Sequence, residues 1–162
     1  TGAAYTTATS DRIVDFAAGA TGDVFQIDIS DSTANASTGI VAAGNGSTAI
    51  AGNLVIKTMT AGTGVTLAAG DEIVVISGTL ADTAALLASI GTGAGIITKS
   101  AANTTTNALL VVWNDGTDTY VTSVADSGTD AAMTTADLTA INLVTLTGVV
   151  TGFNTVNFEA IA

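Results

Sequence analysis

Residues 108–124 read Ala-Leu-Leu-Val-Val-Trp, then Asn-Asp-Gly-Thr-Asp, then Thr-Tyr-Val-Thr-Ser-Val. Two runs rich in β-branched and aromatic residues flank five residues that favour a tight turn, so the segment predicts a β-hairpin. Within the first run, Leu109–Val112 is apolar at every position, as is Ile73–Ile76 elsewhere in the chain. Uninterrupted apolar runs of this length are typical of strands that are buried on both faces. The two runs therefore predict the centre of a β-sheet.

Short apolar runs recur between turn clusters along the rest of the chain. In Val24–Ile29 the apolar residues alternate with Gln26 and Asp28, which is typical of a half-buried strand. The pattern predicts further strands at Arg12–Phe16, Gly39–Ala43, Asn53–Met59, Val65–Leu67, Glu72–Ser77, Ile141–Leu146 and Thr155–Phe158.

Two segments break the strand pattern. Asp82–Ile90 is rich in Ala and Leu and predicts a short helix, capped by Asp82 or Thr83 and ended by Gly91. Thr134–Leu138 predicts a further helical turn. The fold class that follows is all-β, a β-sandwich or a β-roll-like stack of short strands with one or two short helices.

The composition bounds the class of protein. Residues 1–162 are enough for a single domain, and 48% hydrophobic against 10% charged residues indicates a folded body. The net charge of −11 makes nucleic acid and anionic membrane surfaces poor partners. Because no apolar run approaches the length of about 18 residues that a membrane helix needs, we expect no membrane insertion.

The residue types argue against catalysis. The chain has no cysteine and no histidine, so it lacks the thiol nucleophile, the commonest general base and the usual transition-metal ligands. Its Ser and Thr hydroxyls have no histidine to activate them. The glycine-rich Gly91–Gly95 lacks the Lys-Ser/Thr of a phosphate loop. We therefore expect a protein that is not an enzyme.

Carboxylates on Gly/Ser/Thr-rich turns are the ligands that calcium prefers. The first cluster is Asp11 and Asp15, followed after a glycine-rich bend by Asp23. If Asp11 and Asp15 lie on one strand, they share a face with Ile13, because side chains repeat every second residue. The cluster predicts a calcium site that also uses carbonyl oxygens of the bend. The alternative is a solvated strand edge, whose charges prevent pairing with other strands.

Two further acidic clusters follow. Asp115 and Asp118 lie at the tip of the hairpin, where such residues are favoured for backbone reasons alone. Asp126, Asp130 and Asp137 fall at positions 1, 5 and 12 of a twelve-residue calcium loop, although the ligand at position 3 and the glycine at position 6 are missing. This degenerate loop is a second candidate calcium site. Otherwise its last carboxylate is an acidic residue near a helix start.

Three segments resemble the repeats-in-toxin (RTX) exoproteins. Residues 11–30 resemble the D-x-I-x-D-F…G-x-D-x-I-D-L-S stretch that follows their glycine-rich repeats. Leu109–Val121 is similar to their strand, N-D-G-T, strand hairpin, and Thr135–Val149 to their A-D-L-T…L-V-T-L-T-G-V element. No G-G-x-G-x-D repeat is present, so we expect the calcium-filled roll to be missing or to lie upstream of these residues. No H-E-x-x-H motif is present either, so protease activity does not carry over.

The resemblance implies calcium near Asp11 and Asp15, at the end of a β-roll. It also implies that residues 150–162 contain the uncleaved signal that type I exporters recognise, since an acidic residue stands there among apolar ones. The structural alternative for this segment is an ordinary last strand.

The function expected from these features is that of a structural, self-assembling protein of the bacterial cell surface, in an S-layer, matrix or filament. Type I secretion would export it, calcium would order it outside the cell, and its partners would be copies of itself and the exporter. One alternative is an adhesin module for a glycan or cell surface, which an exposed aromatic platform at Trp113 and Tyr120 would favour. Another is a passive secretion domain of a larger exoenzyme.

Overall fold

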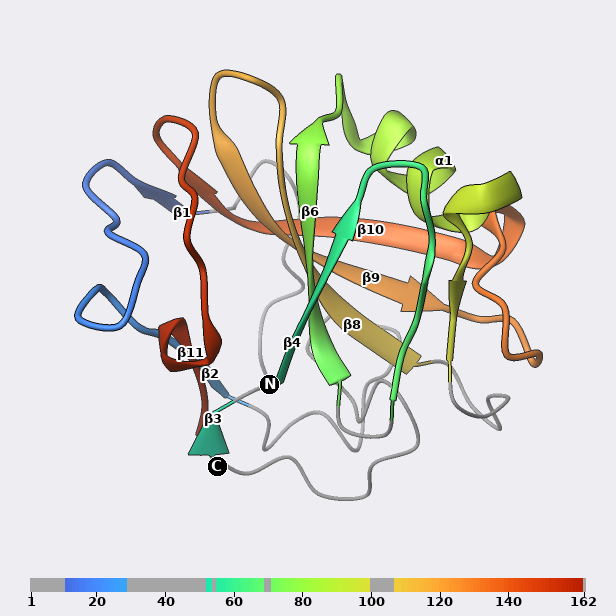
Figure 1. The fold of residues 1–162 in the computed structure, drawn as a ribbon, viewed down its shortest axis with the longest axis horizontal. Helices are drawn as coiled ribbons and strands as arrows, with labels where there is room; N and C mark the ends of the chain where they lie inside the picture. Colours follow the sequence, from blue (N-terminus) through green and yellow to red (C-terminus); the bar gives the residue numbers. More distant parts are fainter. Residues whose placement is uncertain (1–10, 29–51, 54, 69–70, 100–106, 162) are drawn as a thin grey trace.

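The computed structural model describes residues 11–28, 52–53, 55–68, 71–99 and 107–161. Within these ranges it is built mainly of strands, with one α-helix and short 3-10 turns, so the all-β prediction is confirmed (Figure 1). The expected strand Gly39–Ala43 lies outside the described residues.

A six-stranded mixed sheet forms the body of the protein. The predicted hairpin is present as β8 (Asn107–Asn114) and β9 (Thr119–Asp126), which pair antiparallel around the Asn114–Asp118 turn. Next to β8 lies β6 (Asp71–Thr79), which runs parallel to the strands on both of its sides. The strand order across the sheet is β1 (Asp11–Ile13), β10 (Leu138–Leu146), β9 (Thr119–Asp126), β8 (Asn107–Asn114), β6 (Asp71–Thr79) and β4 (Val55–Thr60).

Two small sheets share no strand pairing with the large one. In the first, β11 (Phe158–Ile161) is the central strand, parallel to β2 (Phe25–Asp28) and antiparallel to β3 (Gly52–Asn53). In the second, β5 (Val65–Thr66) pairs with β7 (Ile97–Thr98), a strand that the sequence pattern did not predict. Through the pairing of β11 with β2, the C-terminal part of the chain lies beside its N-terminal part.

The two predicted helical segments are confirmed. Helix α1 (Thr83–Gly91) begins after Asp82, whose carboxylate accepts the N–H of Ala85 at 2.7 Å. Gly91 is its last residue, and only glycine fits there, because a Cβ would lie 2.7 Å from the backbone nitrogen of Thr135. The expected turn at Thr134–Leu138 is the 3-10 turn η3 (Thr135–Asp137). Two further turns are η2 (Gly93–Gly95) and η4 (Thr155–Asn157).

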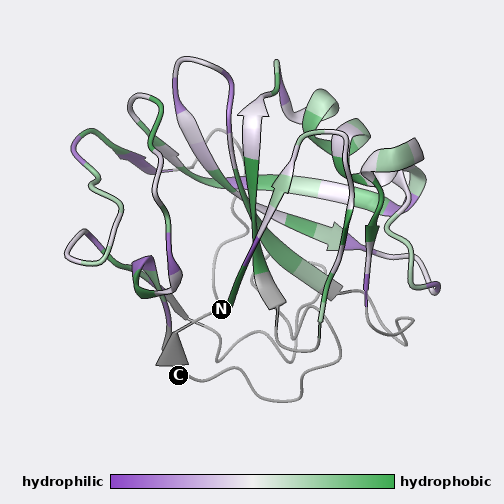
Figure 2. Ribbon diagram, viewed as in Figure 1, coloured by the Kyte–Doolittle hydropathy of each residue, from purple (hydrophilic) through white to green (hydrophobic). Residues whose placement is uncertain are grey.

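Both faces of the large sheet are covered. On one face, alternate side chains of β6 and β8 pack with Leu86 and Ile90 of α1. On the other face, their remaining side chains pack with Phe158 of β11. Figure 2 shows the hydrophobic residues concentrated in these central strands. The prediction of burial on both faces is confirmed for these two runs except at Val75, which is half-buried. Among the described helices, none is long and apolar enough to cross a membrane.

Candidate functional site

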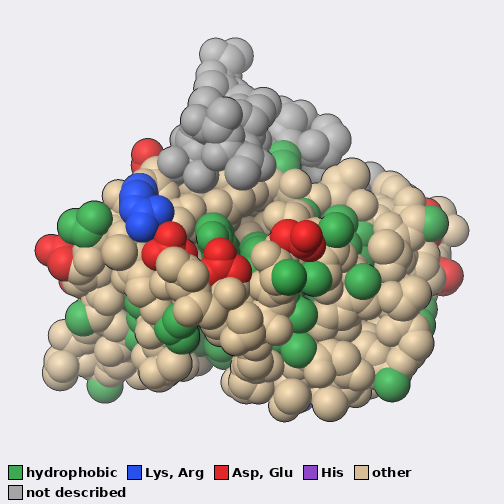
Figure 3. Space-filling view, turned by 90° about the horizontal axis from the view of Figure 1, so that it is seen from above, with side chains coloured by type: hydrophobic (Ala, Val, Ile, Leu, Met, Phe, Trp, Pro, Cys, Tyr) green, Lys and Arg blue, Asp and Glu red, His purple; other side chains and the backbone are tan. Residues whose placement is uncertain are grey.

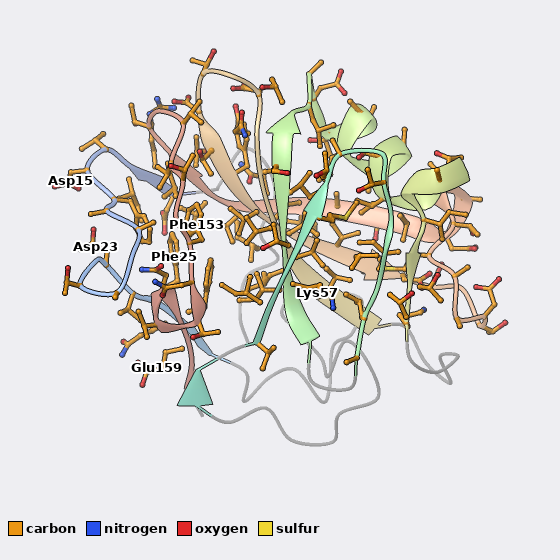
Figure 4. The ribbon with its side chains drawn as sticks, in the orientation of Figure 1. Asp15, Asp23, Phe25, Lys57, Phe153 and Glu159 are labelled. Atoms are coloured by element: carbon orange, nitrogen blue, oxygen red, sulfur yellow. The ribbon has the colours of Figure 1, made fainter. Side chains whose placement is uncertain are left out.

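The acidic turn, residues 14–24, connects β1 to β2 at one end of the molecule. Its two carboxylates, Asp15 and Asp23, line a hollow of about 270 Å³. In Figure 4 the two labelled residues lie on this turn, at the edge of the molecule. The rest of the hollow is apolar, and its lining is completed by Ile13, Phe16, Val24 and Phe25.

Short-range hydrogen bonds fix the shape of the acidic turn. The carboxylate of Asp23 accepts the N–H of Ala17 at 2.8 Å, and the N–H of Asp23 donates to the carbonyl of Ala17 at 2.7 Å. Gly22 is required between them, because a Cβ at that position would lie 2.1 Å from the Ala17 oxygen. Asp23 therefore orders the backbone of the turn.

Asn157 fastens the C-terminal segment to this turn. Its side chain is buried, and its Oδ1 accepts from the N–H of Gly19 at 3.1 Å and of Asn154 at 3.0 Å. Its Nδ2 donates to the carbonyl oxygens of Gly19 at 3.1 Å and Asp23 at 2.8 Å. All four hydrogen-bonding positions of the amide are thus used. Sequence reasoning missed this residue, since an isolated Asn before a strand carries no sign of a partner so far away along the chain.

The four phenylalanines of the chain form a cluster close to Asn157. Phe16 stacks on Phe25 with ring centroids 4.4 Å apart, and Phe153 lies 5.8 Å from both Phe16 and Phe158. Phe25 and Phe158 are 5.5 Å apart. In Figure 4, Phe25 and Phe153 lie between the acidic turn and the C-terminal segment. The aromatic cluster and the Asn157 hydrogen bonds together join the acidic turn to the C-terminal segment. We call this contact region the junction.

The first predicted calcium cluster is only partly assembled. Strand β1 ends at Ile13, so the prediction that Asp11 and Asp15 share a strand face is wrong. Asp11 is exposed on the short strand, whereas Asp15 lies in the bend that follows. The two carboxylates that meet at one hollow are Asp15 and Asp23.

The second predicted calcium cluster holds a buried ion pair. Asp126 is 1% exposed and contacts the ammonium group of Lys99, which is 3% exposed. A Cβ at Gly128 would lie 3.0 Å from Oδ1 of Asp126 and 3.1 Å from Oδ2 of Asp137, so both carboxyl groups approach the same point. Asp130 is exposed. Here a lysine of the chain already supplies a cation to the carboxylate at position 1.

No group of three or more carboxylates in the described parts of the chain is gathered closely enough to hold a metal ion. Both clusters contribute a pair of carboxylates instead. Calcium has six to eight oxygen ligands, so carbonyl oxygens and water would have to complete either site. The calcium assignments remain predictions.

Comparisons with protein-family models, with curated proteins and with solved structures give no match for this chain.

The hairpin tip uses its carboxylate internally, as the backbone interpretation predicted. Oδ1 of Asp115 accepts the N–H groups of Thr117 and Asp118, both at 2.8 Å, and Oδ2 accepts the hydroxyl of Tyr120 at 2.7 Å. The hydrogen bonds from the Asp118 backbone and from Tyr120 lower the pKa of Asp115. The same bond to Asp115, together with burial, raises the pKa of Tyr120 to about 12.

These two shifts predict how the hairpin tip responds to pH. The lowered pKa of Asp115 stabilises the fold above the ordinary value of 3.8, and that stabilisation is lost as the pH falls through the folded value. The raised pKa of Tyr120 stabilises the fold below the ordinary tyrosine pKa of 10. That stabilisation is lost as the pH rises toward about 12. Tyr120→Phe should lower the free energy of unfolding by about 1 kcal/mol at neutral pH. Urea unfolding at a series of pH values should show this difference shrinking at both extremes; a difference independent of pH would contradict the assignment.

Trp113 does not offer an aromatic platform. It is 4% exposed, its ring stacks on that of Tyr120 at 4.6 Å, and its Nε1 donates to Thr122 at 2.9 Å. The exposed Trp113 surface that would have favoured a glycan-binding module is absent, because the indole is part of the core on the α1 side.

Proposed function

We propose that this chain is a non-catalytic structural module of a bacterial surface protein. Type I secretion exports it, calcium orders it outside the cell, and its copies assemble into a layer, matrix or filament. The observation that carries the proposal is the junction: an acidic turn whose carboxylates face a hollow is fastened directly to the last strand of the fold.

The charge balance supports a role for divalent cations. Fourteen acidic side chains face three basic ones, so the chain cannot neutralise itself. Among the described residues, the ion pairs are Arg12 with Asp118 at 3.1 Å and Lys99 with Asp126. Figure 3 shows acidic side chains scattered over one face around a small basic patch. Two copies of such a surface repel each other, and calcium in the medium would remove that repulsion.

Through the junction, calcium bound at the acidic turn would stabilise the whole fold. An ion held by Asp15 and Asp23 would stiffen the turn that donates and accepts the Asn157 hydrogen bonds. Because a ligand that binds only the folded state stabilises it, calcium would favour docking of β11 against β2. In the calcium-poor cytosol the same segments would remain loose enough for export.

This proposal is tested first by thermal unfolding with calcium, with magnesium and with chelator. An extracellular site with a Kd of about 10⁻⁴ to 10⁻³ M would add roughly 0.4–1.4 kcal/mol at about 1 mM calcium, which raises Tm by about 1–6 °C. Asp15→Asn with Asp23→Asn should abolish the calcium-specific part of this rise. Asp82→Asn is the matched control, because it removes one charge and keeps the helix cap. An equal response to calcium in all three proteins would contradict a site at the acidic turn.

A further inference from the structure

Lys99 and Asp126 form a buried contact that the proposed function does not use. Their side chains are 1% and 2% exposed, and the lysine Nζ lies directly against Oδ2 of the carboxyl group. Lys99 follows β7 and Asp126 ends β9, so the contact joins two different sheets. A pair of this kind places an amine and a carboxyl group together where water has little access.

The backbone holds the two partners in place. The N–H of Lys99 donates to the carbonyl of Ala131 at 2.8 Å, and the N–H of Met133 donates to that of Ile97 at 2.9 Å. Ile97 and Met133 are fully buried in the core beneath α1. The segment that carries Lys99 is thus fixed against the segment that follows Asp126. Two reactive groups held next to each other in this way react far more readily than the same groups free in solution.

We propose that Lys99 and Asp126 become joined by an intramolecular isopeptide bond. A proton passes from the ammonium to Oδ2, which leaves a neutral amine beside a neutral acid; burial makes this neutral pair less costly than it is in water. Nζ then attacks Cγ, the Nζ–Cγ bond forms, the Cγ–Oδ2 bond breaks, and Oδ2 leaves as water with a second proton from the amine. No oxidant or other co-reactant is needed.

The remaining carboxyl oxygen is positioned for this step. Oδ1 of Asp126 accepts the backbone N–H of Gly128 at 2.9 Å. Negative charge develops on Oδ1 when Nζ attacks, and a backbone N–H already aimed at that atom stabilises it. The Lys99 contact is made by Oδ2, the atom that leaves. The two oxygens therefore have separate partners that fit their separate roles.

The bond would serve as a covalent staple in a chain that has no cysteine. It would close the chain between β7 and β9 and so restrict the unfolded state, as a disulfide does. It would also replace two buried charges by a neutral amide, which removes the cost of holding an ion pair in the core.

Mass spectrometry of the whole purified chain, denatured before measurement, tests the proposal. The expected mass is that of the sequence less one water molecule, and trypsin should fail to cleave after Lys99 because its amine is acylated. Fragment spectra should then show a branched peptide that joins Lys99 to Asp126. A chain with the full mass of the sequence, cleaved normally at Lys99, would overturn the proposal and leave an ion pair.

Lys99→Arg is the control variant, since arginine keeps the positive charge beside Asp126 but provides no amine for an isopeptide bond. Its mass should equal that of its sequence, with no water lost. This variant also separates the bond from cyclisation at Asp115–Gly116, which loses water without involving Lys99. A loss of water that persists in Lys99→Arg would place the reaction elsewhere and overturn the proposal. Should the variant fail to accumulate, the fragment spectra of the unaltered chain decide alone.

Discussion

Asn157→Ala is expected to lower the free energy of unfolding by about 2–4 kcal/mol, because it removes four hydrogen bonds between a buried side chain and partly buried backbone groups. The lost bonds are those to the N–H and carbonyl of Gly19, to the carbonyl of Asp23 and to the N–H of Asn154. Urea unfolding followed by circular dichroism measures the change. The effect should be large although the truncation removes little apolar surface.

Asn154→Ala is the matched control for this prediction. Its side chain caps η4, accepting the N–H of Val156 at 3.0 Å and that of Asn157 in a capping box, and cap losses cost about 1 kcal/mol. Equal effects of the two substitutions would mean that Asn157 acts only as part of the local turn. In that case the junction to the acidic turn would contribute nothing measurable.

Phe158→Ala is expected to cost about 3–5 kcal/mol, the range found when a large core aromatic is truncated. Phe158 is fully buried, belongs to the core on the β11 side of the large sheet, and lies within 5.8 Å of both Phe25 and Phe153 by ring centroids. A cavity at this point separates the small sheet from the large one. Thermal unfolding should show a much lower Tm, with the α1 side of the sheet affected less.

Phe16→Ala provides the comparison within the same cluster. Phe16 is only half-buried and stacks on Phe25 and Phe153 at the surface of the molecule, so its truncation should cost clearly less than that of Phe158. If the two truncations had the same effect, β11 would not be the element that ties the small sheet to the core.

These substitutions also bear on the predicted export signal within residues 150–162. In the folded chain Asn157 and Phe158 are buried, so an exporter that recognises this segment would have to do so before the domain folds. Asn157→Ala and Phe158→Ala weaken the fold without deleting the segment. If the segment is the signal, both variants should be exported at least as well as the unaltered chain, while deletion of Asn157–Ala162 should abolish export.

Local patterns predicted the centre of the fold well. The hairpin of residues 108–124, the buried run Ile73–Ile76 and the helix after Asp82 all depend on periodicity, turn residues and a cap within a few positions of one another. Val75 is the exception in its run, being half-buried where Ile73 and Val74 are fully buried.

The candidate site was harder to predict because its parts are far apart in sequence. Asn157 and Gly19 are separated by 138 residues, and no pattern in the sequence near either residue indicates that they are in contact. Strand β7 has only two residues, too few to show a period. Asp15 was placed on a strand because the apolar run Arg12–Phe16 continues past the point where pairing stops at Ile13. A calcium loop pattern describes only the loop itself, so it gives no sign that Lys99 is the partner of Asp126.

Electron microscopy of the purified chain, with millimolar calcium and again with chelator and with light scattering recorded alongside, tests calcium-dependent self-assembly most directly. Ordered sheets or filaments should form with calcium and disperse with chelator, and they should fail to form in Asp15→Asn with Asp23→Asn. A monodisperse species of the same size under both conditions would contradict self-assembly as the function of this chain.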